Sequence, residues 1–85
     1  MAYLVRFTPA AEKALASVDG VAQRRIVTKV EGLALNPRPA GVKALKGDDG
    51  AYRLRVGDYR VIYLIHDRQL LILVIDVGHR REVYR

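Results

Sequence analysis

Arginines recur at alternate positions in the middle of this chain. Arg53 and Arg55 precede the dipeptide Gly57-Asp58, and Arg60 follows it. A two-residue Gly-Asp loop between two runs of β-forming residues predicts a β-hairpin in which Arg55 lies directly opposite Arg60. Because successive side chains of a strand point to opposite faces, the arginines are expected to share one face of the sheet. Guanidinium groups bind phosphate oxygens well, so this pattern favours contact with a polyanion.

The charge of the whole chain points to the same class of partner. Like charges placed opposite each other destabilise a sheet, so a small domain that keeps such a pair is expected to present it to something. The chain carries a formal net charge of +6 and a pI near 10.1. These values favour nucleic acid, an anionic membrane or an acidic protein as the partner.

Length and composition limit the remaining possibilities. The 85 residues are sufficient for one domain, spanning 1–85, and 51% of them are hydrophobic, which is ordinary for a globular protein. The absence of cysteine excludes a disulfide scaffold and thiol catalysis and suits a cytoplasmic location. Two isolated histidines give no spacing for metal ligands, so no metal is expected. The longest apolar run, Leu70 to Ile75, is too short to cross a membrane, and we expect no membrane partner.

The elements around the hairpin can be placed from local signals. A strand is expected over residues 2–8, and Thr8-Pro9 then provides an N-cap and a first helical residue. Apolar residues at helical spacing predict helices reaching Val18 and then running from about Val21 to Leu35. Asp19-Gly20 separates these helices, and the short connection predicts an antiparallel helical hairpin.

The second half of the chain is expected to form the rest of a sheet. A loop follows the second helix and reaches Gly50, and the arginine hairpin comes next. The apolar run from Leu70 to Val77 predicts an interior strand covered on both faces, which Gly78 ends or bulges. The fold class is therefore α+β, in the order β-α-α-β-β-β with a possible final strand. The helical hairpin is expected to pack on a twisted, mainly antiparallel sheet, on the face that carries Leu54, Val61 and Tyr63.

Three stretches of the chain resemble the RelE branch of the RelE/ParE toxin superfamily. They are Leu45-Lys46-Gly47, the hairpin from Tyr52 to Tyr63, and the ending Val77-Gly78-His79-Arg80-Arg81-Glu82-Val83-Tyr84, which is the most specific. The resemblance covers essentially the whole chain. It implies the toxin of a type II toxin–antitoxin pair, an endoribonuclease that cuts messenger RNA in the ribosomal A site with the message's own 2′-hydroxyl as nucleophile. The implied partners are messenger RNA, the 70S ribosome and an acidic antitoxin whose amphipathic helix lies in a groove, and no cofactor is implied.

The resemblance also suggests residue roles. By motif position it assigns catalysis to Arg60, Arg80 and Tyr84, and phosphate contacts to Arg53 and Arg55, where RelE enzymes commonly have lysines. Three basic residues beside these motifs are further candidates for RNA contact: Lys43, Lys46 and Arg81. For Lys43 and Lys46, a solvated loop charge is the somewhat simpler reading.

The departure from lysine leaves the general base unassigned. Lysine can lose its proton when like charges crowd it, whereas arginine effectively cannot. Candidates for proton transfer are His79, Tyr84 and Asp58. His79 has the most suitable intrinsic pKa and lies in the specific motif, although a solvated position after a glycine turn explains it equally well.

Two other functions fit the same sequence. One is a ParE-like protein that inhibits DNA gyrase by binding, with the same fold and no nuclease chemistry. The other is a basic RNA-binding module without toxicity. The arginine pattern favours the RelE reading, and the missing lysines weaken that preference relative to the ParE-like one.

Overall fold

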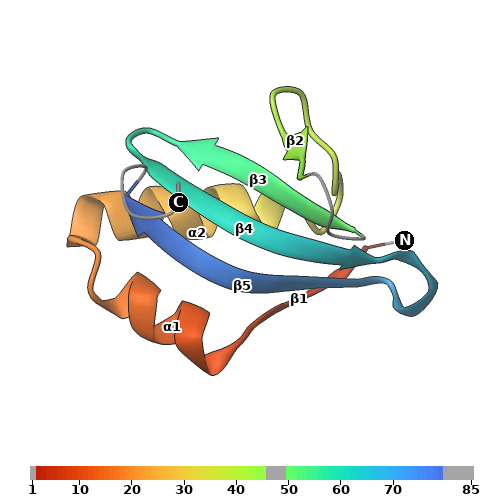
Figure 1. The fold of residues 1–85 in the computed structure, drawn as a ribbon, viewed down its shortest axis with the longest axis horizontal. Helices are drawn as coiled ribbons and strands as arrows, with labels where there is room; N and C mark the ends of the chain where they lie inside the picture. The colour runs from red at the N-terminus through yellow and green to blue at the C-terminus, as the bar shows by residue number, and fades with distance from the viewer. Residues whose placement is uncertain (1, 46–49, 80–85) are drawn as a thin grey trace.

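The protein folds as two helices packed on one face of a five-stranded sheet (Figure 1). A computed structural model describes residues 2–45 and 50–79. The strand order is β1-β5-β4-β3-β2. The elements are β1 (Leu4–Phe7), α1 (Pro9–Ala16), α2 (Gly20–Gly32), β2 (Lys43–Ala44), β3 (Ala51–Val56), β4 (Tyr59–His66) and β5 (Leu71–His79).

Both helices begin at the caps that the sequence provides. The backbone N–H of Ala11 donates to Oγ1 of Thr8 at 3.1 Å, which confirms Thr8 as the N-cap of α1. Asp19 caps α2 in the same way, by accepting from the N–H of Ala22 at 3.2 Å. The second helix is shorter than expected, because its last turn tightens into i to i+3 hydrogen bonds after Gly32 and leaves Leu35 exposed.

The central hairpin has the predicted register. Val56 pairs with Tyr59, Arg55 with Arg60 and Leu54 with Val61, around the two-residue loop. Gly57 has a positive φ of 59°, which glycine adopts without strain at the first loop position. The loop chemistry of this hairpin therefore fixes which side chains share a face.

The sheet is mixed, which local patterns did not indicate. β1 runs parallel to β5, with Leu4 opposite Leu71 and Phe7 opposite Val74, while the other strand pairs are antiparallel. The fifth strand is the short β2, inside the segment that was expected to be a loop reaching Gly50. The optional final strand falls on residues 80–85, which lie outside the described residues.

Strand β5 corrects two expectations. Gly78 neither ends nor bulges the strand, since it pairs with Arg60 inside it. The irregularity lies earlier: Ile62 pairs with Asp76 and Tyr63 with Val74, so Ile75 is the extra residue of a β-bulge. Nor is the strand covered on both faces, because Ile72, Val74 and Val77 are buried while side chains on the other face are half-exposed.

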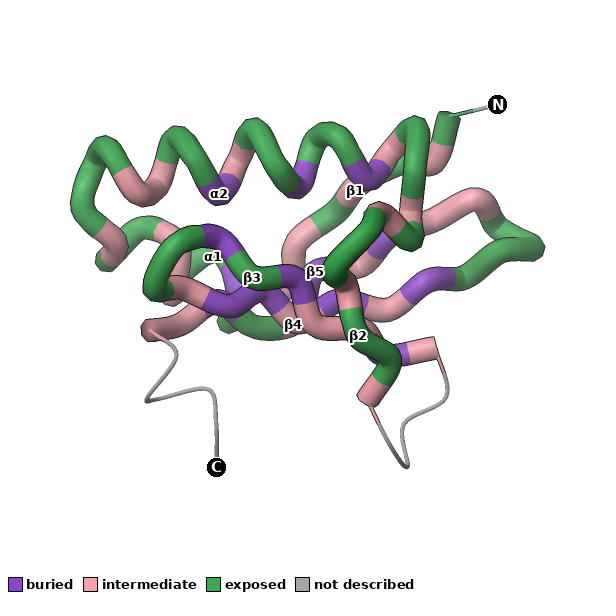
Figure 2. Tube along the Cα trace, turned by 90° about the horizontal axis from the view of Figure 1, so that it is seen from above, coloured by how far each residue is buried: buried purple, intermediate pink, exposed green. Residues whose placement is uncertain are grey.

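The core lies between the helices and the predicted face of the sheet. Figure 2 shows α2 running along the sheet with its buried segments turned toward it. Fully buried side chains come from both layers, among them Ile26, Val30, Val61 and Tyr63. The opposite face of the sheet carries no helix from the described part of the chain. Within that same part, no helix is long and apolar enough to span a membrane.

Candidate nucleic-acid interface

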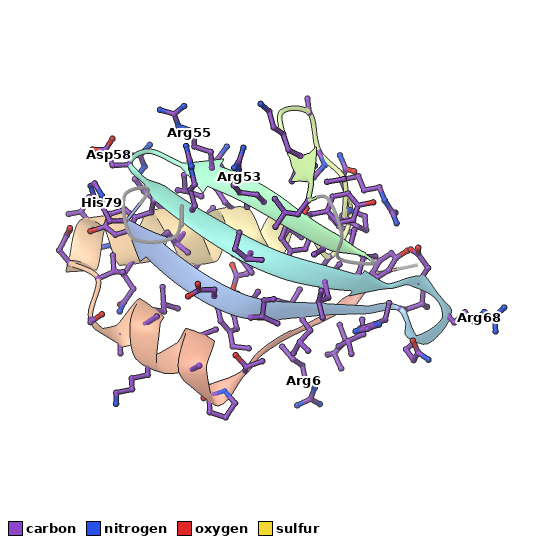
Figure 3. The ribbon with its side chains drawn as sticks, viewed as in Figure 1. Arg6, Arg53, Arg55, Asp58, Arg68 and His79 are labelled. Carbon is purple, nitrogen blue, oxygen red and sulfur yellow. The ribbon has the colours of Figure 1, made fainter. Side chains whose placement is uncertain are left out.

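The hairpin brings its arginines together on the face of the sheet opposite the helices. Arg55 lies across from Arg60, and Arg53 lies two residues from Arg55 on the same strand. Lys43 of β2 pairs with Arg53 and extends this surface to the edge of the sheet. We call Arg53, Arg55 and Arg60 the arginine face. Figure 3 shows Arg53 and Arg55 near the hairpin end, well away from Arg6 and Arg68.

The members of the arginine face differ in exposure. Arg55 is exposed, Arg53 is partly buried, and Arg60 is only 9% exposed. The low exposure sets Arg60 apart from Arg55, its exposed cross-strand partner. Arg55 donates from Nε to the carbonyl oxygen of Gly57 at 3.3 Å, and this bond orients its guanidinium at the turn. Because the Arg60 guanidinium is shielded from water, it would interact more strongly with an anion than an exposed guanidinium does.

His79 is not brought to the arginine face. It pairs with Tyr59, whose side chain packs on the core, and its ring meets the Tyr59 ring edge-on at 5.6 Å between centroids. The bulge at Ile75 is the cause, because an extra residue reverses the faces of every position that follows. Without it, Arg60 would pair with Val77, and His79 would share the arginine face.

The other sequence candidates have different outcomes. Asp58 is the exposed second residue of the hairpin loop, which suits its role as a turn residue. Four candidates lie outside the described residues: Lys46, Arg80, Arg81 and Tyr84.

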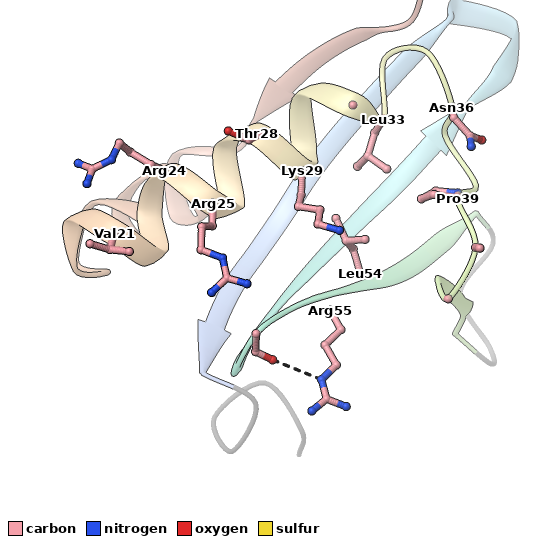
Figure 4. Close-up of a pocket in the computed structure, with 14 residues that line it drawn as sticks. Val21, Arg24, Arg25, Thr28, Lys29, Leu33, Asn36, Pro39, Leu54 and Arg55 are labelled. Atoms are coloured by element: carbon pink, nitrogen blue, oxygen red, sulfur yellow. Dashed lines mark hydrogen bonds between the residues drawn. The ribbon is translucent and has the colours of Figure 1, made fainter.

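A groove of about 1050 Å³ lies between α2 and β3 (Figure 4). Leu33 and Leu54, which are 1% and 7% exposed, contribute to its apolar floor. Arg25 and Lys29 extend from α2 toward β3, and Arg55 lines the opposite side. The groove therefore combines an apolar floor with cationic sides.

The loop that forms one end of the groove is tied to the sheet by polar contacts. Arg38 pairs with Asp67 at 3.0 Å between Nη2 and Oδ2, and it lies over the Tyr52 ring at 5.4 Å. The Tyr3 hydroxyl donates to the same carboxylate at 2.6 Å. The Tyr63 hydroxyl donates to the carbonyl oxygen of Pro37 at 2.7 Å.

Hydrogen bonds shift the pKa values of Asp67 and Tyr3, and burial shifts that of Tyr63. The hydrogen bond from Arg38, followed by that from Tyr3, holds the pKa of Asp67 below its usual value. The bond to Asp67 raises the pKa of Tyr3, because it stabilises the protonated phenol. Burial raises the pKa of Tyr63 to about 12.

The basic residues of the groove, Arg25 and Lys29, were not among the site residues predicted from the sequence. Arg25 and Lys29 are four residues apart, so they share a helix face, and this spacing was the available signal. That this face lies beside the hairpin turn depends on tertiary packing: a Cβ on Gly57 would be 3.8 Å from Nη1 of Arg25. Across residues 2–45 and 50–79, no group of three His, Cys, Asp or Glu side chains gathers as a metal site.

Comparison with known protein families places this arrangement among bacterial and archaeal toxins. The profile of the family described as "ParE toxin of type II toxin-antitoxin system, parDE" matches residues 5–84. The toxin RelG of Mycobacterium tuberculosis is 30% identical over 86 residues, covering 100% of this chain and 99% of RelG. A RelE-like toxin protein of Escherichia coli is 33% identical over 82 residues, covering 94% of this chain and 85% of that protein.

Solved structures of toxin–antitoxin complexes contain chains with the same fold as this protein. The archaeal RelE–RelB complex from Pyrococcus horikoshii contains a chain that superposes with a TM-score of 0.83 at 32% identity, covering 94% of this chain and 97% of that one. A chain of the RelBE2 toxin–antitoxin complex from Mycobacterium tuberculosis also has a TM-score of 0.83, at 28% identity, covering 94% and 100%. With a family match over almost its whole length, this chain belongs to the RelE/ParE superfamily of toxins from type II toxin–antitoxin systems.

Proposed function

We propose that this RelE-like toxin is an endoribonuclease that cleaves messenger RNA in the ribosomal A site, in the cytoplasm. The observation that carries the proposal is the arginine face, on the side of the sheet that no described helix covers. Its spacing suits RNA, because Lys43, Arg53 and Arg55 follow one another across and along two strands and can contact successive phosphates. The relation to RelG and to the RelE-like toxin protein supports this reading.

The proposed reaction is an internal transesterification. The 2′-oxygen of one nucleotide attacks the adjacent phosphorus, so an O2′–P bond forms and the P–O5′ bond breaks. The 2′-hydroxyl loses its proton, the departing 5′-oxygen gains one, and the products carry a 2′,3′-cyclic phosphate and a 5′-hydroxyl. Negative charge gathers on the phosphate oxygens in the transition state, and preoriented guanidinium groups stabilise that charge.

The roles of individual residues follow from exposure and from the family motif. Exposed Arg55 and partly buried Arg53 bind phosphates, while Arg60 supplies fixed positive charge beneath them. Arg80 and Tyr84, by motif resemblance, complete the site, with Arg80 on the developing phosphate charge. Arginines do not act as bases near neutral pH, so they contribute orientation and charge, and the general base is a group other than these arginines.

Primer extension on a message incubated with ribosomes and purified protein tests the proposal. We expect ribosome-dependent cuts within the translated region, and fragments ending in 2′,3′-cyclic phosphate. Arg80→Ala should slow single-turnover cleavage on the order of 10²–10³-fold, as loss of other preorganised charge donors does, with much less effect on ribosome binding. Arg6→Gln, remote from the arginine face in Figure 3, is the matched control. Intact messages under all conditions contradict the proposal.

A second candidate is inhibition of DNA gyrase by binding. Two observations favour it: the matching profile describes a ParE toxin, and arginines occupy the positions where RelE enzymes commonly have lysines. A supercoiling assay run beside the primer extension separates the two functions. Inhibited gyrase with intact messages would assign the protein to the ParE-like function. RNA binding without effect in either assay would leave the RNA-binding module.

We also propose an acidic antitoxin as partner, with an amphipathic helix of that antitoxin in the α2–β3 groove. RelE proteins from Pyrococcus horikoshii and Mycobacterium tuberculosis were solved in complexes with antitoxins. In this chain the apolar floor suits the apolar stripe of a helix, and Arg25 and Lys29 suit carboxylates beside that stripe. The 13 residues of α2 extend about 20 Å, so a partner helix of three to four turns fills the groove.

A further inference from the structure

Arg55 is positioned at the boundary between two surfaces. Arg55 is the cross-strand partner of Arg60 on the arginine face. Its side chain also lines the groove between α2 and β3. Among the groove cations that Figure 4 labels, Arg24, Arg25 and Lys29 come from the helix, and Arg55 is the one contributed by the hairpin. Arg53, one step back along the same face, does not line the groove.

The edge of the sheet explains this double position. β2 pairs with β3 only through Lys43 opposite Arg53 and Ala44 opposite Tyr52. Beyond Arg53, the last residues of β3 therefore have no strand beside them on that edge in the described part of the chain. A side chain there can reach around the edge, and the bond from Nε of Arg55 to the carbonyl oxygen of Gly57 holds its guanidinium near the turn.

We propose that Arg55 serves both surfaces, so that an acidic helix in the groove and an RNA strand on the arginine face exclude each other through it. This inference rests on the proposed function. A carboxylate and a phosphate both prefer the forked donor geometry of a guanidinium, and one guanidinium cannot offer that geometry to both at once. A helix carboxylate paired with Arg55 thus removes a phosphate contact and places negative charge beside the arginine face.

An acidic helix is favoured over RNA as the occupant of the groove. Leu33 and Leu54 leave the floor apolar, and Val21, 62% exposed, adds apolar surface at one end. Phosphates leave such surface unburied, whereas the apolar stripe of an amphipathic helix covers it. Single-stranded RNA is usually bound through aromatic side chains that stack on bases, and none lines this groove.

The test measures two probes on the full chain by fluorescence anisotropy at 150 mM salt. One probe is a 2′-O-methyl RNA 10-mer, which lacks the nucleophile and so is not cleaved. The other is a lactam-stapled amphipathic peptide of 15 residues, with leucines on one face and glutamates beside them. We expect each probe to displace the other from the parent protein. No peptide binding up to 1 mM, or no RNA binding, overturns the inference.

Four variants assign the competition to one residue. Lys29→Gln should weaken peptide binding alone, and Arg53→Gln should weaken RNA binding alone, each by about five- to tenfold. Arg55→Gln should weaken both by similar factors and allow the two probes to bind independently. Arg6→Gln measures the general effect of losing one charge, which is small because the Debye length is about 8 Å at this salt concentration.

The outcomes separate this inference from its alternatives. The shared-arginine inference is wrong if Arg55→Gln weakens the binding of only one probe. It is also wrong if each probe still displaces the other from that variant. If Lys29→Gln weakens RNA as much as peptide, the groove binds RNA and the helix is not its occupant. If all four variants behave as expected while messages stay intact on ribosomes, the nuclease proposal fails and the shared role of Arg55 stands.

Discussion

Tyr63→Phe removes one hydroxyl and tests how the loop beside the groove is held. The Tyr63 ring is 0% exposed and stacks on Tyr52 at 5.9 Å between centroids. Its hydroxyl donates to the carbonyl oxygen of Pro37 at 2.7 Å, across 26 residues of sequence. Pro37 begins the loop whose residues 39–41 line the end of the groove. Phenylalanine keeps the ring and deletes only this bond.

The expected loss of stability comes from that one bond. A hydrogen bond contributes about 0.5–1.5 kcal/mol net, and a carbonyl left without its donor adds to the loss, so we expect about 1–2 kcal/mol at pH 7. For a domain of this size, that change lowers Tm by roughly 5–12 °C. Tyr3→Phe, which deletes a hydroxyl from an exposed bond to Asp67, is the matched control and should cost clearly less.

The pH dependence provides a second readout of the same group. Burial raises the pKa of Tyr63 to about 12, above the value near 10 of an unfolded tyrosine. Because the pKa of Tyr63 is raised in the folded state, the stability that protonated Tyr63 contributes is fully present below pH 10. This stability is lost as pH rises from 10 toward 12. Two pKa units correspond to roughly 3 kcal/mol, so the parent should lose up to that amount over this range, while the variant lacks this component.

Urea unfolding at pH 7, 9, 10 and 11 measures both effects. The stability gap between parent and Tyr63→Phe should be constant up to about pH 9 and should narrow from pH 10 upward. Equal stabilities at pH 7 would refute the role of the bond to Pro37. A gap that stays constant through pH 11 would refute the assignment of the raised pKa to Tyr63.

Three further experiments test the register, the loop contact and the position of His79. Val61→Asp should unfold the domain, because an unpaired buried carboxylate costs several kcal/mol of roughly 5–15 available, whereas Ile62→Asp on the opposite, half-exposed face should be tolerated in the same thermal melts. Asp67, whose pKa is lowered by Arg38 and then Tyr3, should titrate below its usual value by NMR, so its contribution is present above about pH 4 and lost only at lower pH; a normal midpoint contradicts the contact. If the toxin cleaves RNA as proposed, His79→Gln should keep the parent's single-turnover rate and pH profile, and a large loss of rate with a changed pH profile would show that His79 transfers the proton.

Local signals in the sequence were sufficient for the hairpin and the helix starts. The Gly57-Asp58 loop sets the register within the hairpin, and a period of two then places Arg55 opposite Arg60. Thr8 caps the first helix as predicted, and Asp19, predicted only to separate the two helices, caps the second through the same kind of hydrogen bond. Such features depend on neighbours in the chain, and this is why they can be predicted without a structure.

Features that depend on distant segments could not be predicted in the same way. The parallel pairing of β1 with β5 joins the two ends of the described chain. The bulge at Ile75 lies in a run whose residues are apolar from Leu70 to Val77 except for Asp76, so no alternation of polarity marks the extra residue. The face of the sheet on which His79 lies depends on that bulge, so local pattern could not predict it.

Under the proposals above, the arginine face also bears on how an antitoxin would inhibit this toxin. Arg55 and Arg60 are cross-strand partners, and like charges in that position destabilise a sheet. An anion bound at Arg55 relieves the repulsion, whether it is a phosphate of RNA or a carboxylate of a partner helix. Each ligand then stabilises the folded protein in proportion to its own occupancy. If the proposals above hold, both ligands neutralise the same arginine pair, so the stabilisation gained from RNA is unavailable to an antitoxin helix and the two compete for Arg55.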